Sequence, residues 1–302
     1  MAEGVRSGPG ELRRFVLEDR PVRGHWVRLG EAWHELRGHQ AHPPVIEALL
    51  GEALTASVLL AATLKFQGTL TLQFAGSGQV GLLVAQCTHD FRIRGVARVD
   101  APPPPEAGFR DLVGDGRLTV TIESEERATR YQGIVPLEGS SLAASLESYF
   151  ETSEQLPTRL ALAADASGAT GLLLQKLPAP ASGEAAGAEA QRIWEDLEAG
   201  VLLLPRAMLL EGGVDATLHS VFATHDCRLF GAQPVRFECR CGDGRIEGML
   251  RALGIEELRA VLAEQGAVSV TCEFCQRRYR YDAIDVERLF RSDAGPAPPT
   301  LN

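Results

Sequence analysis

Apolar residues fill nearly every position of one segment, PPVIEALLGEALTASVLLAATL at residues 43–64. Two prolines open this segment, and proline suits the first turn of a helix because its missing N–H is not needed there. A helix that is apolar on nearly all sides is usually buried in the middle of a fold. The pattern therefore predicts a central, buried helix.

Shorter apolar runs separated by turn residues follow this helix. Their pattern and short connections predict strands, in part an antiparallel meander, at Thr69–Phe74, Val80–Cys87, Phe91–Val99, Arg117–Glu123, Tyr131–Leu137, Arg159–Ala164 and Gly171–Lys176. Ser140 or Ser141 is placed to cap a helix that has Leu142 and Leu146 on one face. Helices and antiparallel strands in separate blocks indicate an α+β fold.

Composition divides the chain into four parts. Leu177–Gln191 contains only Leu, Pro, Ala, Ser, Gly, Glu and Gln, which is typical of a linker. We therefore predict an N-terminal α+β core domain, built of antiparallel sheet with central helices, at residues 1–177. The other predicted parts are a flexible linker and helical connecting region at 178–233, a small C-terminal module at 234–291 and a disordered tail at 292–302.

The connecting region contains more than linker. Gln191–Leu197 and Val214–Phe222 have helical spacing, and Val201–Leu210 is strongly apolar. Because apolar surface must be buried, we expect this region to dock on one of its neighbours. Docked connectors tend to be among the less stable parts of a structure.

Charge and the N-terminal residues narrow the class of protein. The net charge of −10 argues against a general binder of nucleic acid or anionic membranes. The longest uncharged apolar stretch, Ala53–Leu64, is shorter than the ~18–20 residues of a membrane span. The first fifteen residues have no apolar signal core, so we expect a cytoplasmic protein in a reducing compartment.

Four of the six cysteines form two close pairs near the C-terminus. Cys239-Arg240-Cys241 is followed, after 30 residues, by Cys272-Glu273-Phe274-Cys275. Zinc favours four thiolates at the corners of a tetrahedron, and each pair can supply one edge. The intervening residues predict two short helices and a strand, which bring the pairs together. We therefore predict one Zn²⁺ per chain, held by Cys239, Cys241, Cys272 and Cys275 in a closed, non-catalytic site.

The spacing leaves two uses of this zinc-binding module open. The simpler use is an inert structural centre. The other is a redox switch: zinc contributes on the order of 10–16 kcal/mol to the folding of such modules, and oxidation of the ligands removes that contribution. Nearby arginines can offset the thiolate charge, namely Arg236, Arg240, Arg245, Arg277, Arg278 and Arg280.

Several stretches together resemble one known family. Residues 43–87, residues 130–160 and the segments VRFECRCGDGRIEGMLRALG and VTCEFCQRRYRYDAIDVERLF are similar to the 33-kilodalton chaperonin (heat shock protein 33) family of redox-regulated chaperones. The resemblance extends from about Phe15 to about Phe290. It implies a cytoplasmic stress-response protein that acts as an ATP-independent holdase and is not an enzyme.

The resemblance also implies a regulatory cycle. The reduced, zinc-bound form is a folded, inactive monomer. Oxidation forms the disulfides Cys239–Cys241 and Cys272–Cys275, releases zinc and unfolds the connecting region. The chain then forms a homodimer and binds unfolded or partly folded client proteins, with no membrane or specific nucleic-acid partner. Cys87 and Cys227 match no role in this cycle, and we expect Cys227 to be a partly buried spectator thiol.

Other motifs have ordinary structural explanations. Residues 76–81 fit GxGxxG but lie between two predicted strands, so they predict a hairpin turn. Asp282 and Asp285 are placed to cap a helix. A polar loop before the central helix is expected to carry His34, His39 and His42.

Two further function classes are weighed against the redox chaperone. One is an interaction protein whose zinc module binds RNA or a protein partner constitutively through Arg277, Arg278 and Arg280. The other is a metalloenzyme, which four cysteine ligands argue against because they leave no open metal position.

Overall fold

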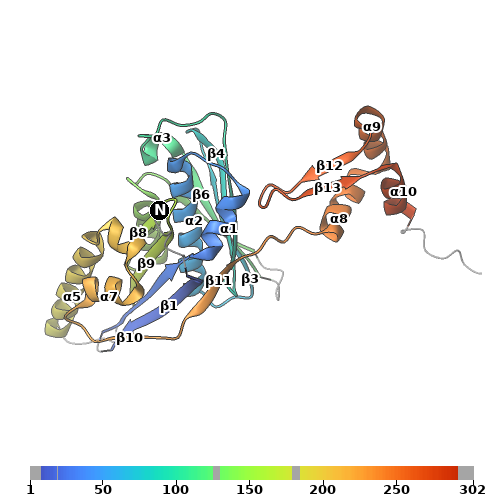
Figure 1. The fold of residues 1–302 in the computed structure, drawn as a ribbon. Helices are drawn as coiled ribbons and strands as arrows, with labels where there is room; N and C mark the ends of the chain where they lie inside the picture. Colours follow the sequence, from blue (N-terminus) through green and yellow to red (C-terminus); the bar gives the residue numbers. More distant parts are fainter. Residues whose placement is uncertain (1–7, 19, 125–129, 179–183, 292–302) are drawn as a thin grey trace, which may run out of the picture. The chain divides into compact units, whose positions relative to one another are not determined.

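The computed structural model describes residues 8–18, 20–124, 130–178 and 184–291 (Figure 1). The chain forms two compact units, Met1–Glu238 and Cys239–Asn302. The predicted tail at 292–302 and residues 179–183 of the predicted linker lie outside the described residues. The linker prediction was wrong for residues 184–191, because they form the start of a helix that runs over Glu184–Leu202. The predicted domain boundaries therefore stay predictions.

Unit 1 is an α+β structure, as the pattern predicts. Its strands are β1 (Gly10–Leu17), β2 (Val22–Arg28), β3 (Gly68–Ala75), β4 (Val80–Thr88), β5 (Arg92–Val99), β6 (Arg117–Ser124), β7 (Arg130–Pro136), β8 (Thr158–Ala164), β9 (Ala169–Lys176), β10 (Cys227–Leu229) and β11 (Gln233–Phe237). Its helices are α1 (Glu31–His39), α2 (Pro44–Thr63), α3 (Phe109–Val113), α4 (Leu142–Tyr149), the π-helix η1 (Phe150–Glu154), α5 (Glu184–Leu202), α6 (Arg206–Glu211) and α7 (Val214–Phe222).

Helix α2 is the predicted central helix, and it lies within the curve of the sheet (Figure 1). It contacts β4 and β5 on one side and β8 and β9 on the other. By length and composition α2 is apolar enough to cross a membrane, contrary to our expectation that no segment is long enough. Because 72% of its most apolar window is buried inside the protein, it has the character of a core helix.

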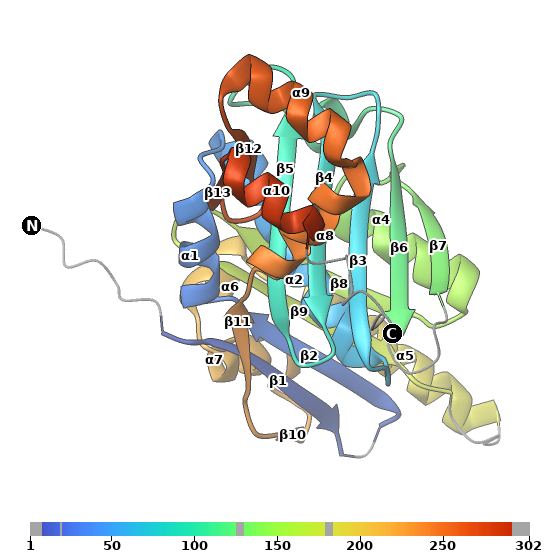
Figure 2. The ribbon, with the colours of Figure 1, turned by 90° about the vertical axis from the view of Figure 1, so that its right-hand side faces the viewer.

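The large sheet joins two antiparallel halves through one short strand. Its order is β7-β6-β3-β4-β5-β11-β1-β2-β9-β8, and Figure 2 shows β5, β4, β3, β6 and β7 side by side. Strand β11 pairs in parallel with β5, where Arg236 lies opposite Arg92, and antiparallel with β1, where Val235 lies opposite Gly10. The second half, from β1 to β8, is therefore attached to the first by a strand that comes from the end of the connecting region.

Strand β9 is buried on both faces, which explains its uninterrupted apolar run. Leu173 belongs to the main core around α2, while Leu172 and Leu174 belong to a second core on the opposite face. Helices α5, α6 and α7 cover that second face (Figure 1), with Trp194 and Phe222 among the buried side chains. The predicted docking of the connecting region is thus present within unit 1.

All seven predicted strands are present as β3 to β9, and the GxGxxG segment is a hairpin turn. A Cβ at Gly78 would lie 2.4 Å from the Leu112 carbonyl oxygen, so glycine permits close approach to α3. The sequence did not indicate β1, β2, β10 or β11. The expected polar histidine loop was partly wrong, because His34 and His39 belong to helix α1.

Unit 2 is small and has its own core. It comprises α8 (Asp243–Leu253), α9 (Ile255–Gln265), the hairpin β12 (Val268–Thr271) and β13 (Arg278–Tyr281), and α10 (Ala283–Arg291). Asp282 and Asp285 accept hydrogen bonds from each other's backbone N–H, which confirms the predicted cap of α10. The buried side chains of this core are Ile246, Leu250, Leu258, Val268, Tyr279, Tyr281, Val286 and Leu289.

Candidate metal centre

Two backbone segments of unit 2 present the four clustered thiols. Cys239 and Cys241 lie before α8, in a segment without regular secondary structure. Cys272 and Cys275 lie in the tight turn between β12 and β13, where the Gln276 N–H donates to the Cys272 carbonyl oxygen at 2.8 Å. Gln276 has φ of +56°, which closes the turn in the left-handed region. The turn therefore brings the thiols of Cys272 and Cys275 close together at the end of the hairpin.

The geometry of the four thiols fits a tetrahedral metal ion. Their Sγ atoms all lie within 4.8 Å of one another. The Sγ atoms of Cys239 and Cys272 are 3.5 Å apart, and those of Cys241 and Cys275 are 3.4 Å apart. Four thiolates at about 2.3 Å from zinc would be about 3.8 Å apart, so little movement is needed. All four cysteines are free thiols, and they come together as the spacing predicts.

Local interactions shift the pKa values of Cys239, Cys241 and Cys275 in different directions. Burial raises the pKa of Cys239 and Cys275. For Cys241 burial also acts to raise the pKa, but the Tyr279 hydroxyl and the neighbouring thiols outweigh it and lower the pKa to about 7. The lowered pKa of Cys241 favours its thiolate, which is the form that binds a metal ion.

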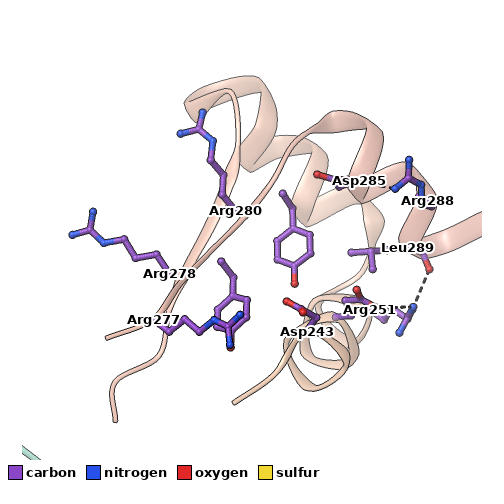
Figure 3. A pocket seen from close by; sticks show the side chains of 11 residues that line it. Asp243, Arg251, Arg277, Arg278, Arg280, Asp285, Arg288 and Leu289 are labelled. Atoms are coloured by element: carbon purple, nitrogen blue, oxygen red, sulfur yellow. Dashed lines mark hydrogen bonds and ion pairs between the residues drawn. The ribbon is translucent and has the colours of Figure 1, made fainter. Parts of the chain in front are cut away.

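A polar pocket of about 510 Å³ lies in unit 2 between β13, α8 and α10 (Figure 3). Residues alternate along β13, so Tyr279 and Tyr281 are buried while Arg278 and Arg280 are exposed. Figure 3 shows Arg278 and Arg280 directed away from Asp243 and Arg251.

The arginines that lie near the cysteines in the sequence differ in the groups that they contact and in the unit to which they belong. The guanidinium group of Arg277 lies 5.3 Å from the centre of the Tyr279 ring, and Arg245 donates to the Arg240 carbonyl oxygen at 3.4 Å. Arg236 belongs to β11 of unit 1. Their predicted role in offsetting thiolate charge stays a prediction.

The other two cysteines belong to unit 1. Cys87 is buried in β4, and burial raises the pKa of its thiol. Cys227 in β10 is half-buried, as expected, and burial raises its pKa to about 11. Both thiols are therefore poorly ionised at neutral pH, and neither joins the four-cysteine cluster.

The fold and the thiol cluster define a class: an α+β protein with a small appended unit that carries a four-cysteine metal-type centre. The family model described as "Hsp33 protein" matches residues 10–282. A 33 kDa chaperonin of Nitrosococcus oceani is 41% identical over 279 residues, which cover 92% of this chain and 93% of that protein. One of Pseudomonas paraeruginosa is 40% identical over 294 residues, covering 97% and 98%.

A solved structure has the same fold. The crystal structure of the 33 kDa chaperonin (heat shock protein 33 homolog) of Thermotoga maritima superposes with a TM-score of 0.80. It covers 94% of this chain and 99% of its own, at 24% sequence identity. The chain belongs to the Hsp33 family of chaperones.

Proposed function

We propose that this chain is a redox-regulated, ATP-independent holdase chaperone, not an enzyme, that works in the cytoplasm. In this proposal the reduced protein holds one Zn²⁺ through Cys239, Cys241, Cys272 and Cys275 and is inactive. The oxidised protein binds unfolding client proteins and prevents their aggregation. The single observation that carries the proposal is the convergence of four free thiols within 4.8 Å in a small unit.

The folding of unit 2 depends on these thiols. Only a thin core, with Leu250 and Val286 at its centre, supports the described part of this unit. A unit of this size gains little free energy from its core alone. Zinc held by four thiolates supplies on the order of 10–16 kcal/mol to such folds. Loss of the thiolates therefore favours unfolding of unit 2.

Oxidation converts the ligands into groups that cannot hold the metal. The four zinc-bound thiolates lose four electrons, two S–S bonds form and Zn²⁺ is released. Two molecules of hydrogen peroxide take up these four electrons, together with four protons from solvent, and become four molecules of water. The family resemblance supports the pairs Cys239–Cys241 and Cys272–Cys275. Distances of 3.5 and 3.4 Å between sulfurs of different motifs are those expected of a reduced, tetrahedral arrangement.

Unfolding of unit 2 acts first on β11. Cys239 follows Glu238 directly, and the Glu238 carboxylate pairs with Arg92 of β5 at 2.8 Å. Strand β11 has few register pairs with β1 and β5, so we infer that it detaches readily once the following residues lose their fold. Detachment of β11 leaves the edge of β5 and the Gly10–Leu12 part of β1 unpaired, while β10 still pairs with Phe15–Leu17 of β1. Exposed edges recruit other strands. The homodimer of the oxidised form is proposed on this basis.

Undocking of α5 to α7 supplies the client surface. These helices cover Phe15, Trp26 and Leu172 on the outer face of the sheet. Their own contribution includes Val201 and Leu209, both buried, although the neighbouring Leu202 is 84% exposed. Apolar surface of this kind, once uncovered, binds exposed apolar segments of unfolding proteins. The clients are therefore proposed to be unfolded or partly folded proteins in general.

Light scattering of an aggregating, chemically unfolded client tests the proposal. The protein is added either reduced and zinc-loaded or after treatment with peroxide under mild heat. We expect only the oxidised form to suppress aggregation. Equal suppression by both forms would contradict the switch, and suppression by neither would contradict the chaperone function.

A constitutive interaction protein is the second candidate. The exposed side chains of Arg278 and Arg280 on one face of the β12–β13 hairpin favour it. Salt-dependent RNA binding that is lost on charge-neutralising substitution of Arg277, Arg278 and Arg280 would support this candidate. Absence of RNA binding by the reduced protein would remove the RNA-binding form of it.

A further inference from the structure

A cavity of about 320 Å³ lies in unit 1 between the two halves of the large sheet. Strands β3 and β6 contribute Leu70, Val120 and Ile122, while β2 and β9 contribute Arg23 and Gln175. The end of α2 and the α4–η1 segment provide the remaining walls, with mainly apolar side chains. The volume is at the small end of ligand pockets, about 300–1000 Å³. The proposed redox cycle makes no use of this cavity.

Arg23 is a cation whose hydrogen-bond partner in this apolar setting is a neutral amide. Its Nε and Nη2 groups donate to the Gln175 side-chain oxygen at 3.0 and 2.6 Å. No ion pair joins Arg23 to a carboxylate among residues 8–18, 20–124, 130–178 and 184–291. Burial and the nearby Arg14 lower the pKa of Arg23, which indicates that its charge is poorly compensated. A half-buried cation held by a neutral amide gains free energy from an anion.

Gln175 holds Arg23 in a defined position. The Gln175 side chain is 1% exposed, and its amide nitrogen donates to the Thr158 hydroxyl at 3.1 Å. This bond orients the amide so that its oxygen faces Arg23. The guanidinium group is therefore positioned by buried neighbours before any ligand arrives, as in a built binding site.

The cavity also contains a carboxylate, that of Glu154 in η1, and this carboxylate already accepts hydrogen bonds. The Tyr131 and Tyr149 hydroxyls both donate to Glu154 Oε1, at 3.2 and 3.1 Å, and lie 3.0 Å apart. Glu154 ends the π-helix η1, and Gln155 follows with φ of +53°. Single π-helical turns occur frequently at functional sites. Glu154 Oε1 accepts from two separate hydroxyls, whereas Arg23 donates twice to a single amide oxygen. Since a guanidinium group has five N–H donors, Arg23 keeps donor capacity for a negatively charged ligand.

We propose that this cavity binds a small amphipathic carboxylate, with its carboxylate on Arg23 and a short aliphatic chain against Leu70, Ile122 and Phe150. Medium-chain fatty acids have this chemistry. The hydroxyls of Tyr131 and Tyr149 lie where they can contact the bound molecule without supplying its counter-charge.

Titration calorimetry of the reduced, zinc-loaded full chain with sodium decanoate below its micelle concentration tests the site. We expect saturable binding of one decanoate per chain, at least tenfold tighter than binding of 1-decanol or decylamine. This comparison uses only the unaltered protein. Absence of saturable decanoate binding, or equal binding of all three probes, would overturn the proposal, and a preference for decylamine would assign the charge recognition to Glu154 instead.

Two variants and a matched control locate the site. Arg23→Gln should weaken decanoate binding at least tenfold and leave 1-decanol binding within about twofold. Leu146→Trp should fill the cavity and reduce binding of both probes. Arg117→Gln removes an exposed arginine of β6 and should change neither. Circular dichroism and zinc content check that each variant is folded, and unchanged decanoate binding in a folded Arg23→Gln would refute the role of Arg23.

Discussion

The core around α2 and the core of unit 2 reach a stable fold in different ways. The first buries a complete apolar helix within a curved sheet, with Leu54 and Leu59 fully enclosed. The second encloses only a few side chains and places four free thiols at its margin. A large apolar core is insensitive to the redox state of thiols, whereas a small core that relies on thiolate ligands is not. The two units should therefore respond separately to oxidation.

The docked helices α5 to α7 are intermediate between these two cases. Their apolar contacts with the sheet resemble a core, yet Leu202 at the end of α5 is 84% exposed and the following Leu203 is 77% exposed. Polar links supplement the docking, including the Arg159–Glu198 ion pair at 2.7 Å. Surface pairs of this kind contribute about 0–1 kcal/mol, so the apolar contacts dominate.

Cys272→Ser should give the largest effect. Removal of one thiolate is expected to abolish tight zinc binding and to leave unit 2 unfolded under reducing conditions, since it forfeits much of the ~10–16 kcal/mol supplied by the metal. Zinc content and hydrogen exchange of unit 2 measure this. Cys227→Ser is the matched control, because Cys227 lies outside the cluster and should leave both unchanged. Full zinc occupancy with an unchanged fold in Cys272→Ser would show that the site is wrongly assigned.

Trp194→Ala should loosen the docked helices without touching the thiols. Trp194 is 3% exposed in the second core, and truncation of such a side chain costs about 3–5 kcal/mol. We expect the reduced, zinc-bound variant to suppress client aggregation in part, because undocking then occurs without oxidation. Leu203→Ala, at an exposed position, should stay inactive when reduced. If the reduced Trp194→Ala protein shows faster hydrogen exchange in α5 but is as inactive as the parent, undocking of the helices does not by itself produce client binding.

Leu54→Ala should weaken unit 1 and spare unit 2. The fully buried Leu54 lies in α2, so a cavity should cost about 2–5 kcal/mol. Urea unfolding followed by far-ultraviolet circular dichroism should show a transition at lower urea concentration than in the parent. The urea concentration at which zinc is half released should stay unchanged. Coincident shifts of both transitions would mean that the two units unfold as one.

Glu52→Gln should change the pH dependence of unit 1 by a few kcal/mol at most. Burial raises the pKa of Glu52 to about 7, and Arg206, at 3.4 Å, only partly opposes this. The contribution of Glu52 to stability is complete below about pH 4.5 and is lost as the pH rises through 7. Urea midpoints at pH 5 and pH 8 should therefore differ more in the parent than in Glu52→Gln. An equal difference in the two proteins would rule out titration of Glu52 as the cause.

Sequence patterns predicted some elements well and missed others for identifiable reasons. The helix α2 and the strands β3 to β9 follow from local periodicity and turn residues. Strand β1 was missed because Arg13 and Arg14 interrupt its apolar pattern, and β11 because it contains Pro234 and pairs only with distant strands. The four cysteines were predicted as one cluster because close spacing within each pair restricts where the thiols can lie.

Local pattern was enough for the buried helix, the meander of strands and the thiol cluster, since each depends on residues close together in the chain. Long-range pairing alone places β11 between β5 and β1, and brings Arg23 and Gln175 to a cavity walled by β3 and β6. Those arrangements depend on strand partners far apart in the chain, and no short-range periodicity encodes which edges meet. The amino-acid sequence therefore predicted the metal-type centre. Only the tertiary structure showed how the two half-sheets are connected and where the cavity lies.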